Sequence, residues 1–151
     1  MDYTILKNEL KSRESEFKDL SDDKVAEILN SKDFKLIKSR FINERTILAE
    51  IGGQVGATIL DKLDAISPYQ SAVRRMLKFL AMDSGVDIGH QGTLSQITSI
   101  VSAGGLTQVE GELLKGLALL PASRCEVLGI PSVTYNDINV VRSQIAEETM
   151  I

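Results

Sequence analysis

The sequence predicts an all-α fold, a compact single-domain bundle of about six to seven helices. Apolar residues recur at three- and four-residue spacing along most of the chain, and residues that cap helices stand before these stretches. No long stretch alternates polar and apolar residues as a half-buried strand does. The 151 residues, of which 43% are hydrophobic, are enough for one domain with its own core.

Two short helices are predicted at the start of the chain. Tyr3, Leu6 and Leu10 recur at helical spacing, and Ser21 can cap a second helix that has two acidic residues in its first turn. The segment 34–42 alternates only loosely, so a short extended segment is the alternative to a helix there.

The distribution of charge predicts where the core lies. Residues 1–50 carry 10 basic and 11 acidic side chains, whereas residues 51–100 carry 4 of each. We therefore expect the first part to be solvated and the middle to be mostly buried. The prediction is one helical domain over residues 1–151, with two peripheral helices in 1–30 and the core helices in 43–147.

A long central helix and a second one after it are expected next. Asn43 can cap the long helix, whose apolar positions continue at helical spacing as far as Leu63. The following helix is expected to begin at Ser67 and Pro68, because proline fits the first turn of a helix, and to end near Asp83.

The later helices are predicted from their start and stop signals. A helix over about 94–101 should stop at the pair Gly104–Gly105. Thr107 and Glu110 have the spacing of a capping box and should open a helix that reaches Leu120.

The stretch with the only cysteine is predicted to be a joint between helices rather than a catalytic loop. Pro121 stops the preceding helix, a short turn of helix covers about 122–128, and Gly129 supplies the left-handed residue that follows. Thr134 then caps the terminal helix, with Asp137 as the acidic residue of its capping box.

The cysteine and the histidine are the residue types most often found in catalytic and metal sites. Cys125 has neither a histidine nor a lysine within its own turn, so we interpret it as a buried or half-buried structural thiol, with a nucleophile as the alternative. His90 could act as a general base only with a carboxylate beside it, and Asp87 is the nearby candidate; capping the next helix is the preferred interpretation. One cysteine and one histidine cannot form a zinc site.

The glycine-rich stretch IGGQVGA does not match a dinucleotide-binding loop, because Gln54 stands where the second glycine is required. Gly52 and Gly56 are better explained by close packing of a neighbouring backbone. Asp61 and Asp64 share a helix face but lack the further carboxylates of a two-metal site. Two basic faces are interpreted as solvated: Arg74, Arg75 and Lys78, and Lys35, Lys38 and Arg40.

Composition argues against several classes of partner. A net charge of −4 and a pI near 5.1 give no overall basic surface for a phosphate backbone, so no nucleic acid is expected. No apolar run approaches the roughly 18 to 20 residues that cross a bilayer, and the charged start of the chain is unlike a secretory signal. We expect no membrane partner, no cofactor, no metal ligand, no catalytic residue and synthesis in the cytosol.

Four segments carry a resemblance. They are VAEILN (Val25–Asn30), LTQVEGELLKGLA (Leu106–Ala118), SRCEVLG (Ser123–Gly129) and VTYNDINVVR (Val133–Arg142). Together they resemble a family of small helical proteins encoded among the structural and tail genes of tailed bacteriophages. Cys125 stands where that family usually has alanine, and nothing carries over for the middle of the chain.

The resemblance implies a non-enzymatic structural component of the virion, a small helical subunit that docks on larger head, neck or tail proteins. Its partners would be other phage structural proteins, and also itself in a symmetric assembly, and it would be made in the host cytoplasm. The alternative is a free phage-encoded adaptor or inhibitor that binds a host or phage protein through helix surfaces. We expect the interface on residues 3–30, and expect 43–145 to fold without residues 1–33.

Overall fold

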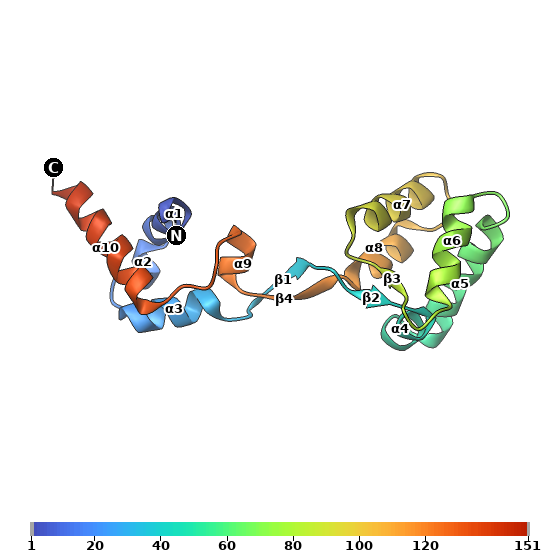
Figure 1. Cartoon of the computed structure of the whole chain (residues 1–151), viewed down its shortest axis with the longest axis horizontal. Coiled ribbons are helices and arrows are strands. Elements are labelled where there is room, and N and C mark those ends of the chain that lie inside the picture. The colour runs from blue at the N-terminus through green and yellow to red at the C-terminus, as the bar shows by residue number, and fades with distance from the viewer. Residues whose placement is uncertain (1, 151) are drawn as a thin grey trace. The chain divides into compact units, whose positions relative to one another are not determined.

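The computed structural model describes residues 2–150 and is mainly helical (Figure 1). Within this range the chain forms ten helices and four short strands. In chain order they are α1 (Thr4–Ser12), α2 (Glu14–Phe17), α3 (Asp22–Asn30), β1 (Phe34–Ile37), β2 (Phe41–Ile42), α4 (Glu44–Glu50), α5 (Gly53–Ile66), α6 (Ser71–Leu80), β3 (Val86–Asp87), α7 (Gln91–Ser102), α8 (Gln108–Gly116), β4 (Leu119–Ala122), α9 (Arg124–Leu128) and α10 (Tyr135–Thr149).

The chain is divided into two compact units. Unit 1 combines both ends of the chain, up to residue 36 and from residue 121 onward, and holds α1, α2, α3, α9 and α10. Unit 2 is the continuous stretch 37–120, with β2, β3 and α4 to α8. β1 pairs with β4, and the boundary between the units falls within these two strands.

Unit 2 is built from helices that are neighbours in sequence. α5 packs against both α4 and α6, and α7 packs against α8. β2 pairs with β3 in antiparallel register, with Phe41 opposite Asp87 and Ile42 opposite Val86. The core of this unit is almost entirely aliphatic: Ile42, Ile47, Ile59, Leu60, Leu63, Val73, Met76, Leu80, Ile88, Ile97, Ile100, Leu106, Leu114, Leu117 and Ala118.

Unit 1 is built around the last helix. α10 packs against α1 and α3, and α3 also packs against the short α9. The side chains that fill its core come from both ends of the chain: Leu6, Leu10, Phe17, Val25, Ala26, Leu29, Cys125, Val133, Ile138 and Val141.

The predicted division into peripheral and core helices is therefore corrected. Leu6, Val25 and Leu29 are fully buried, so the helices of residues 1–30 form a core and do not lie at its periphery. The high charge of this region misled the prediction because the charged side chains lie on the outward faces of amphipathic helices. α9 and α10, which the prediction places in a core of 43–145, pack against α1 and α3 of the segment that the predicted deletion removes.

The predicted helix starts are largely confirmed by their caps. Ser21 accepts a hydrogen bond from the backbone N–H of Lys24, and Asn43 accepts one from Thr46. Capping boxes form at two predicted pairs: Thr107 with Glu110, and Thr134 with Asp137. Gly129 follows α9 in the left-handed conformation, as expected.

The long central helix was predicted as one element and is two. Gly52 has a φ of 119°, a conformation that other residues rarely adopt, and it separates α4 from α5. The two helices then fold back on each other at Gly56, where an added Cβ would lie 3.0 Å from the carbonyl oxygen of Ile47. Close backbone packing is thus confirmed for Gly56, whereas Gly52 serves the turn.

Two further elements differ from the all-α prediction. The segment 34–42 contains β1 and β2, which confirms the extended alternative, and the expected end of the helix at Leu120 is instead strand β4. α6 begins at Ser71 and not at Ser67, since the chain makes a turn through Pro68 after α5. The fold is mainly α with short antiparallel strands, and its helices are more numerous and shorter than predicted.

Candidate functional site

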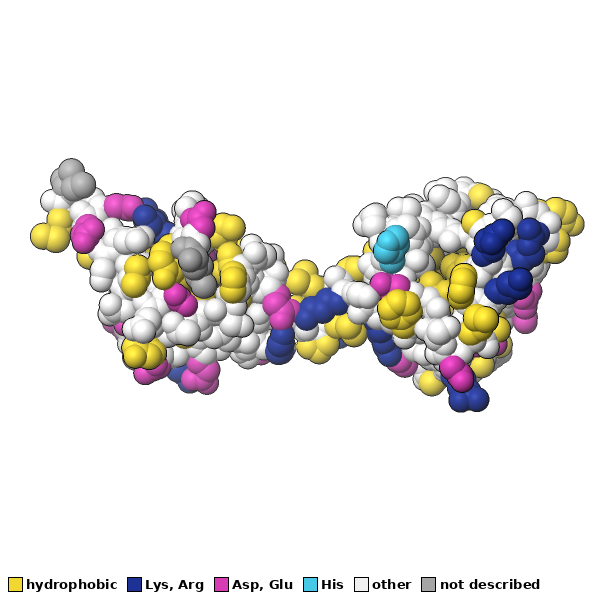
Figure 2. Space-filling view, in the orientation of Figure 1, with side chains coloured by type: hydrophobic (Ala, Val, Ile, Leu, Met, Phe, Trp, Pro, Cys, Tyr) yellow, Lys and Arg dark blue, Asp and Glu magenta, His cyan; other side chains and the backbone are white. Residues whose placement is uncertain are grey.

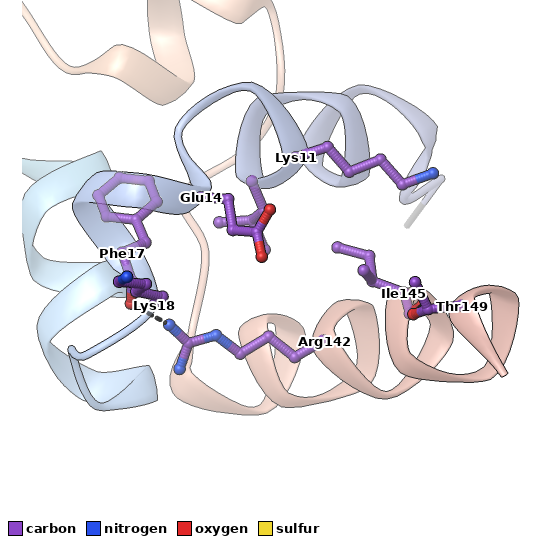
Figure 3. Close-up of a pocket in the computed structure, with 8 residues that line it drawn as sticks. Lys11, Glu14, Phe17, Lys18, Arg142, Ile145 and Thr149 are labelled. Carbon is purple, nitrogen blue, oxygen red and sulfur yellow. Dashed lines mark hydrogen bonds between the residues drawn. The ribbon is translucent and has the colours of Figure 1, made fainter.

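A groove in unit 1 is the candidate binding site. It has a volume of about 420 Å³ and is bounded by α1 and α2 on one side and by α10 on the other (Figure 3). Eight residues line it: Leu10, Lys11, Glu14, Phe17, Lys18, Arg142, Ile145 and Thr149.

The groove has an apolar floor and a charged rim. Leu10 and Phe17 are buried side chains of the unit 1 core, and Ile145 is half-buried on α10. Lys11 and Lys18 are exposed at the rim. An apolar group that enters would therefore leave water for contact with aliphatic and aromatic carbon, which is favourable.

Arg142 fixes the two sides of the groove to each other. Its guanidinium donates a hydrogen bond to the carbonyl oxygen of Phe17 at 2.7 Å (Figure 3). It also donates to the carbonyl oxygen of Leu20 at 2.9 Å and to Asp22 Oδ1 at 2.8 Å. Phe17 is the last residue of α2, and Leu20 lies in the turn that follows it. One guanidinium can bond all three acceptors because it carries five N–H donors in one plane.

An ion-pair cluster joins α1 to α10, and one of its members, Lys11, lines the groove. Lys7 and Lys11 on α1 each donate to the carboxylate of Glu148 on α10 at 2.7 Å. These hydrogen bonds, with Lys11 contributing most, lower the pKa of Glu148 from 4.5 to about 2. Because the carboxylate is exposed, these ion pairs contribute little to the free energy of unfolding.

Two rim charges are available to a partner. Glu14 and Lys18 have no ion-pair partner within residues 2–150. Figure 3 shows the carboxylate of Glu14 directed from α2 toward the space above α10. The rim thus offers one acceptor and one cation to a polar group of a bound segment.

A buried carboxylate on α1, that of Glu9, joins this helix to α9. Glu9 is 5% exposed, and Arg124 donates to both of its oxygens at 3.0 Å, while Arg13 donates to Oε1 at 3.3 Å. Burial acts to raise the pKa of Glu9, but the hydrogen bonds and charges of Arg124 and Arg13 outweigh it, so the pKa is lowered. The guanidinium of Arg13 also lies 4.5 Å from the ring centre of Phe17.

Cys125 is buried in this unit, as predicted. It is 1% exposed, and burial raises its pKa, which disfavours the reactive thiolate. Its Sγ lies 3.5 Å from Asn30 Oδ1. The Asn30 amide also bonds the backbone of Val133 in both directions, donating to its O at 2.7 Å and accepting from its N at 3.0 Å.

His90 caps a helix, as expected. Its Nδ1 accepts a hydrogen bond from the backbone N–H of Gly92 at 3.1 Å, at the start of α7; its ring is the cyan side chain in Figure 2. The carboxylate of Asp87 instead accepts from Ser39 Oγ at 2.6 Å and from the backbone N–H groups of Arg40 and Gly89 at 3.0 Å. Asp87 therefore joins two loop segments.

The remaining residues singled out in the sequence do not converge. Asp61 and Asp64 are exposed on α5, and residues 2–150 contain no group of three or more potential ligands that could hold a metal ion. In one basic face, Arg40 pairs with Glu50 and donates to the carbonyl oxygen of Leu117 at 3.0 Å. It is a structural contact and not a free surface charge.

Comparisons with known proteins give no match to this chain among protein-family models, curated proteins or solved structures. Across residues 2–150, each helix is too short or too polar to span a bilayer.

The groove itself was missed by the sequence reasoning. Its two walls meet through contacts such as Arg142 to Phe17, 125 residues apart in the chain. The available signal was Arg142, a cation placed beside the apolar face of the last helix that includes Val141 and Ile145. That signal indicates a buried polar contact but does not name its partner.

Proposed function

We propose that the chain is a structural subunit of a tailed-phage particle and that it binds a larger phage structural protein through the groove of unit 1. One observation carries the proposal. Of the four segments that resemble phage proteins, three lie mainly in α3, α9 and α10, and α3 packs against both α9 and α10 in unit 1. α10 also forms one wall of the groove.

The lining of the groove suits a protein segment as its occupant. Helix-in-groove binding uses a few apolar side chains seated in a hydrophobic trough, with charges at its edges. The floor of Leu10, Phe17 and Ile145 can receive one or two such side chains, and Glu14 and Lys18 can meet a cation and an anion beside them. The proposal assigns no catalytic role to these residues.

Mass spectrometry of purified virions tests the first half of the proposal. The chain should be recovered at a fixed ratio to the head, neck or tail proteins after the particles have been washed at high salt. Recovery at trace amounts, with the chain remaining in the cell lysate, would instead support a free adaptor or inhibitor.

A blocked groove tests the second half. Glu14→Trp places a large ring over the floor, and Ser15→Trp, at the next exposed position of α2, is the matched control outside the lining. Both variants should keep the circular dichroism and melting temperature of the wild type. Incorporation into particles should fail for Glu14→Trp and persist for Ser15→Trp; equal incorporation of the two would exclude the groove as the interface.

A further inference from the structure

The outward face of α6 in unit 2 combines positive charge with exposed apolar groups. Val73, Met76 and Leu80 point into the core. The rest of this region forms a surface hollow of about 390 Å³, which we call the α6 surface, lined by Arg74, Arg75, Lys78, Phe79 and Met82.

The α6 surface gathers three cations without a counter-charge on one helix. Arg74, Arg75 and Lys78 have no ion-pair partner within residues 2–150, and α6 contains no acidic residue. Two other cations of unit 2 are paired with carboxylates, Arg40 with Glu50 and Lys62 with Glu110. Unit 2 as a whole carries eight basic and eight acidic side chains, so the positive charge is local to this helix.

Two large apolar side chains lie among these cations. Phe79 is 52% exposed and Met82 is 53% exposed. Figure 2 shows dark blue side chains gathered where Figure 1 labels α6, with yellow side chains beside them. Apolar groups left in water next to a hollow lower the free energy when a partner covers them.

We propose that the α6 surface binds an acidic segment of a partner protein, one that seats an apolar side chain against Phe79 and Met82 and places carboxylates on the three cations. Two of the three cations are arginines, and a guanidinium can bond both oxygens of a carboxylate at once. Carboxylates are therefore suitable ligands for this surface. Charge complementarity of this kind speeds association and fixes orientation.

A protein segment fits this surface better than a nucleic acid or a membrane. A phosphate backbone would use the three cations but leave Phe79 and Met82 without a role unless bases were unstacked onto the ring. An anionic bilayer gains only about 1 kcal/mol for each nearby cation. The rest of unit 2 carries five basic and eight acidic side chains, so it adds no further attraction. The α6 surface belongs to unit 2, so this inference does not depend on the groove proposed above.

The experiment is a selection of peptides on the full-length protein. Peptides that bind the wild type are selected from a displayed random library. Peptides that also bind the Arg74→Glu/Arg75→Glu/Lys78→Glu variant are then removed. The enriched peptides should carry Asp or Glu on both sides of a Leu, Ile, Met or Phe. Their affinity, measured by fluorescence anisotropy, should fall steeply as salt is raised.

Single substitutions then locate the binding. Arg75→Glu should weaken the best peptide by about tenfold or more. Arg45→Glu makes the same change at an exposed cation of α4 that also lacks an ion-pair partner, and should change the affinity by less than about twofold. Phe79→Ser should weaken binding without changing its salt dependence, because it removes apolar contact and no charge.

Three results would overturn the proposal. The first is an absence of peptides enriched on the wild type over the triple variant, and the second is an enriched set without acidic residues. The third is tighter binding of a single-stranded oligonucleotide or of phosphatidylserine vesicles than of the selected peptides, which would assign the surface to that class of partner.

Discussion

The two units bury similar aliphatic cores but assemble them from different parts of the chain. In unit 2 the packed pairs are consecutive helices, so most of its contacts close short loops. In unit 1 the first and last helices meet, and Tyr3 donates a hydrogen bond to Asp137, 134 residues further on. Contacts between nearby segments cost less loop-closure entropy. Unit 2 should therefore form readily by itself, and unit 1 only when both ends of the chain are present.

The two units also differ in net charge. Unit 1 carries nine basic and thirteen acidic side chains, which is the whole net charge of −4, while unit 2 is neutral. Unit 1 also holds ion pairs between distant parts of the chain, such as Arg124 with Glu9 and Arg142 with Asp22. A guanidinium bonds a carboxylate only in particular geometries. These ion pairs therefore help to fix how helices that are distant in the sequence pack against each other in unit 1.

The largest effect is expected from cutting the chain at the boundary. A fragment of residues 37–120 should fold with a cooperative thermal transition, since it contains the complete core of unit 2. The matched fragment 37–151 should show the same transition, with residues 121–151 exchanging their amide hydrogens freely because α10 has lost α1 and α3. Hydrogen exchange followed by mass spectrometry measures both. A fragment 37–120 without a transition would show that the two units are not separable.

A matched pair of core substitutions should each affect one unit. Leu29→Ala removes a fully buried side chain from unit 1, and Ile59→Ala does the same in unit 2. Each should cost about 2–5 kcal/mol, the usual range for a cavity of this size. Hydrogen exchange should lose protection only in the substituted unit; equal loss across both would mean that they unfold as one.

Acid should destabilise unit 1 partly through Glu9. The folded pKa of Glu9 is lower than its ordinary value of 4.5, so its stabilising contribution is present above that pH and is lost as the pH falls below it. Glu9→Gln should cost about 1–3 kcal/mol at neutral pH, because two arginines lose a charged acceptor. The variant should also lose less stability than the wild type between neutral pH and pH values below 4.5. Parallel urea titrations across this range compare the two, and identical pH profiles would exclude the role of Glu9.

The smallest effect is expected at the cysteine. Cys125→Ala removes one small buried group and a weak contact to Asn30, and should cost about 1 kcal/mol or less. Chemical denaturation gives the change in stability, and particle incorporation should be unchanged. A folded Cys125→Ala protein that fails to enter particles would contradict the structural role of the thiol.

Sequence patterns predicted the local features of both units and failed where distant residues meet. The caps at Ser21, Asn43, Thr107 and Thr134 were predictable because each depends on residues three positions apart. The break at Gly52 was missed because a glycine is compatible with both a helix interior and a turn, and only packing decides between them.

The groove and the division into units lay beyond sequence reasoning for the same reason. Apolar spacing shows that one face of α1 is buried, but not that α10 covers it. The α6 surface was visible as three cations on one helix, and was interpreted as solvated. The exposure of Phe79 and Met82 beside them became apparent only in the structure.

The most direct test of the account is a photo-crosslink from the groove in assembled particles. A photoreactive phenylalanine analogue is placed at Lys18, on the rim of the groove, and as a control at Asp61, an exposed position of α5 in unit 2. The account predicts that irradiated virions yield one dominant adduct from position 18, with a single larger structural protein, and no such adduct from position 61. No adduct from position 18, in virions that contain the chain, would contradict the claim that the groove is the docking site.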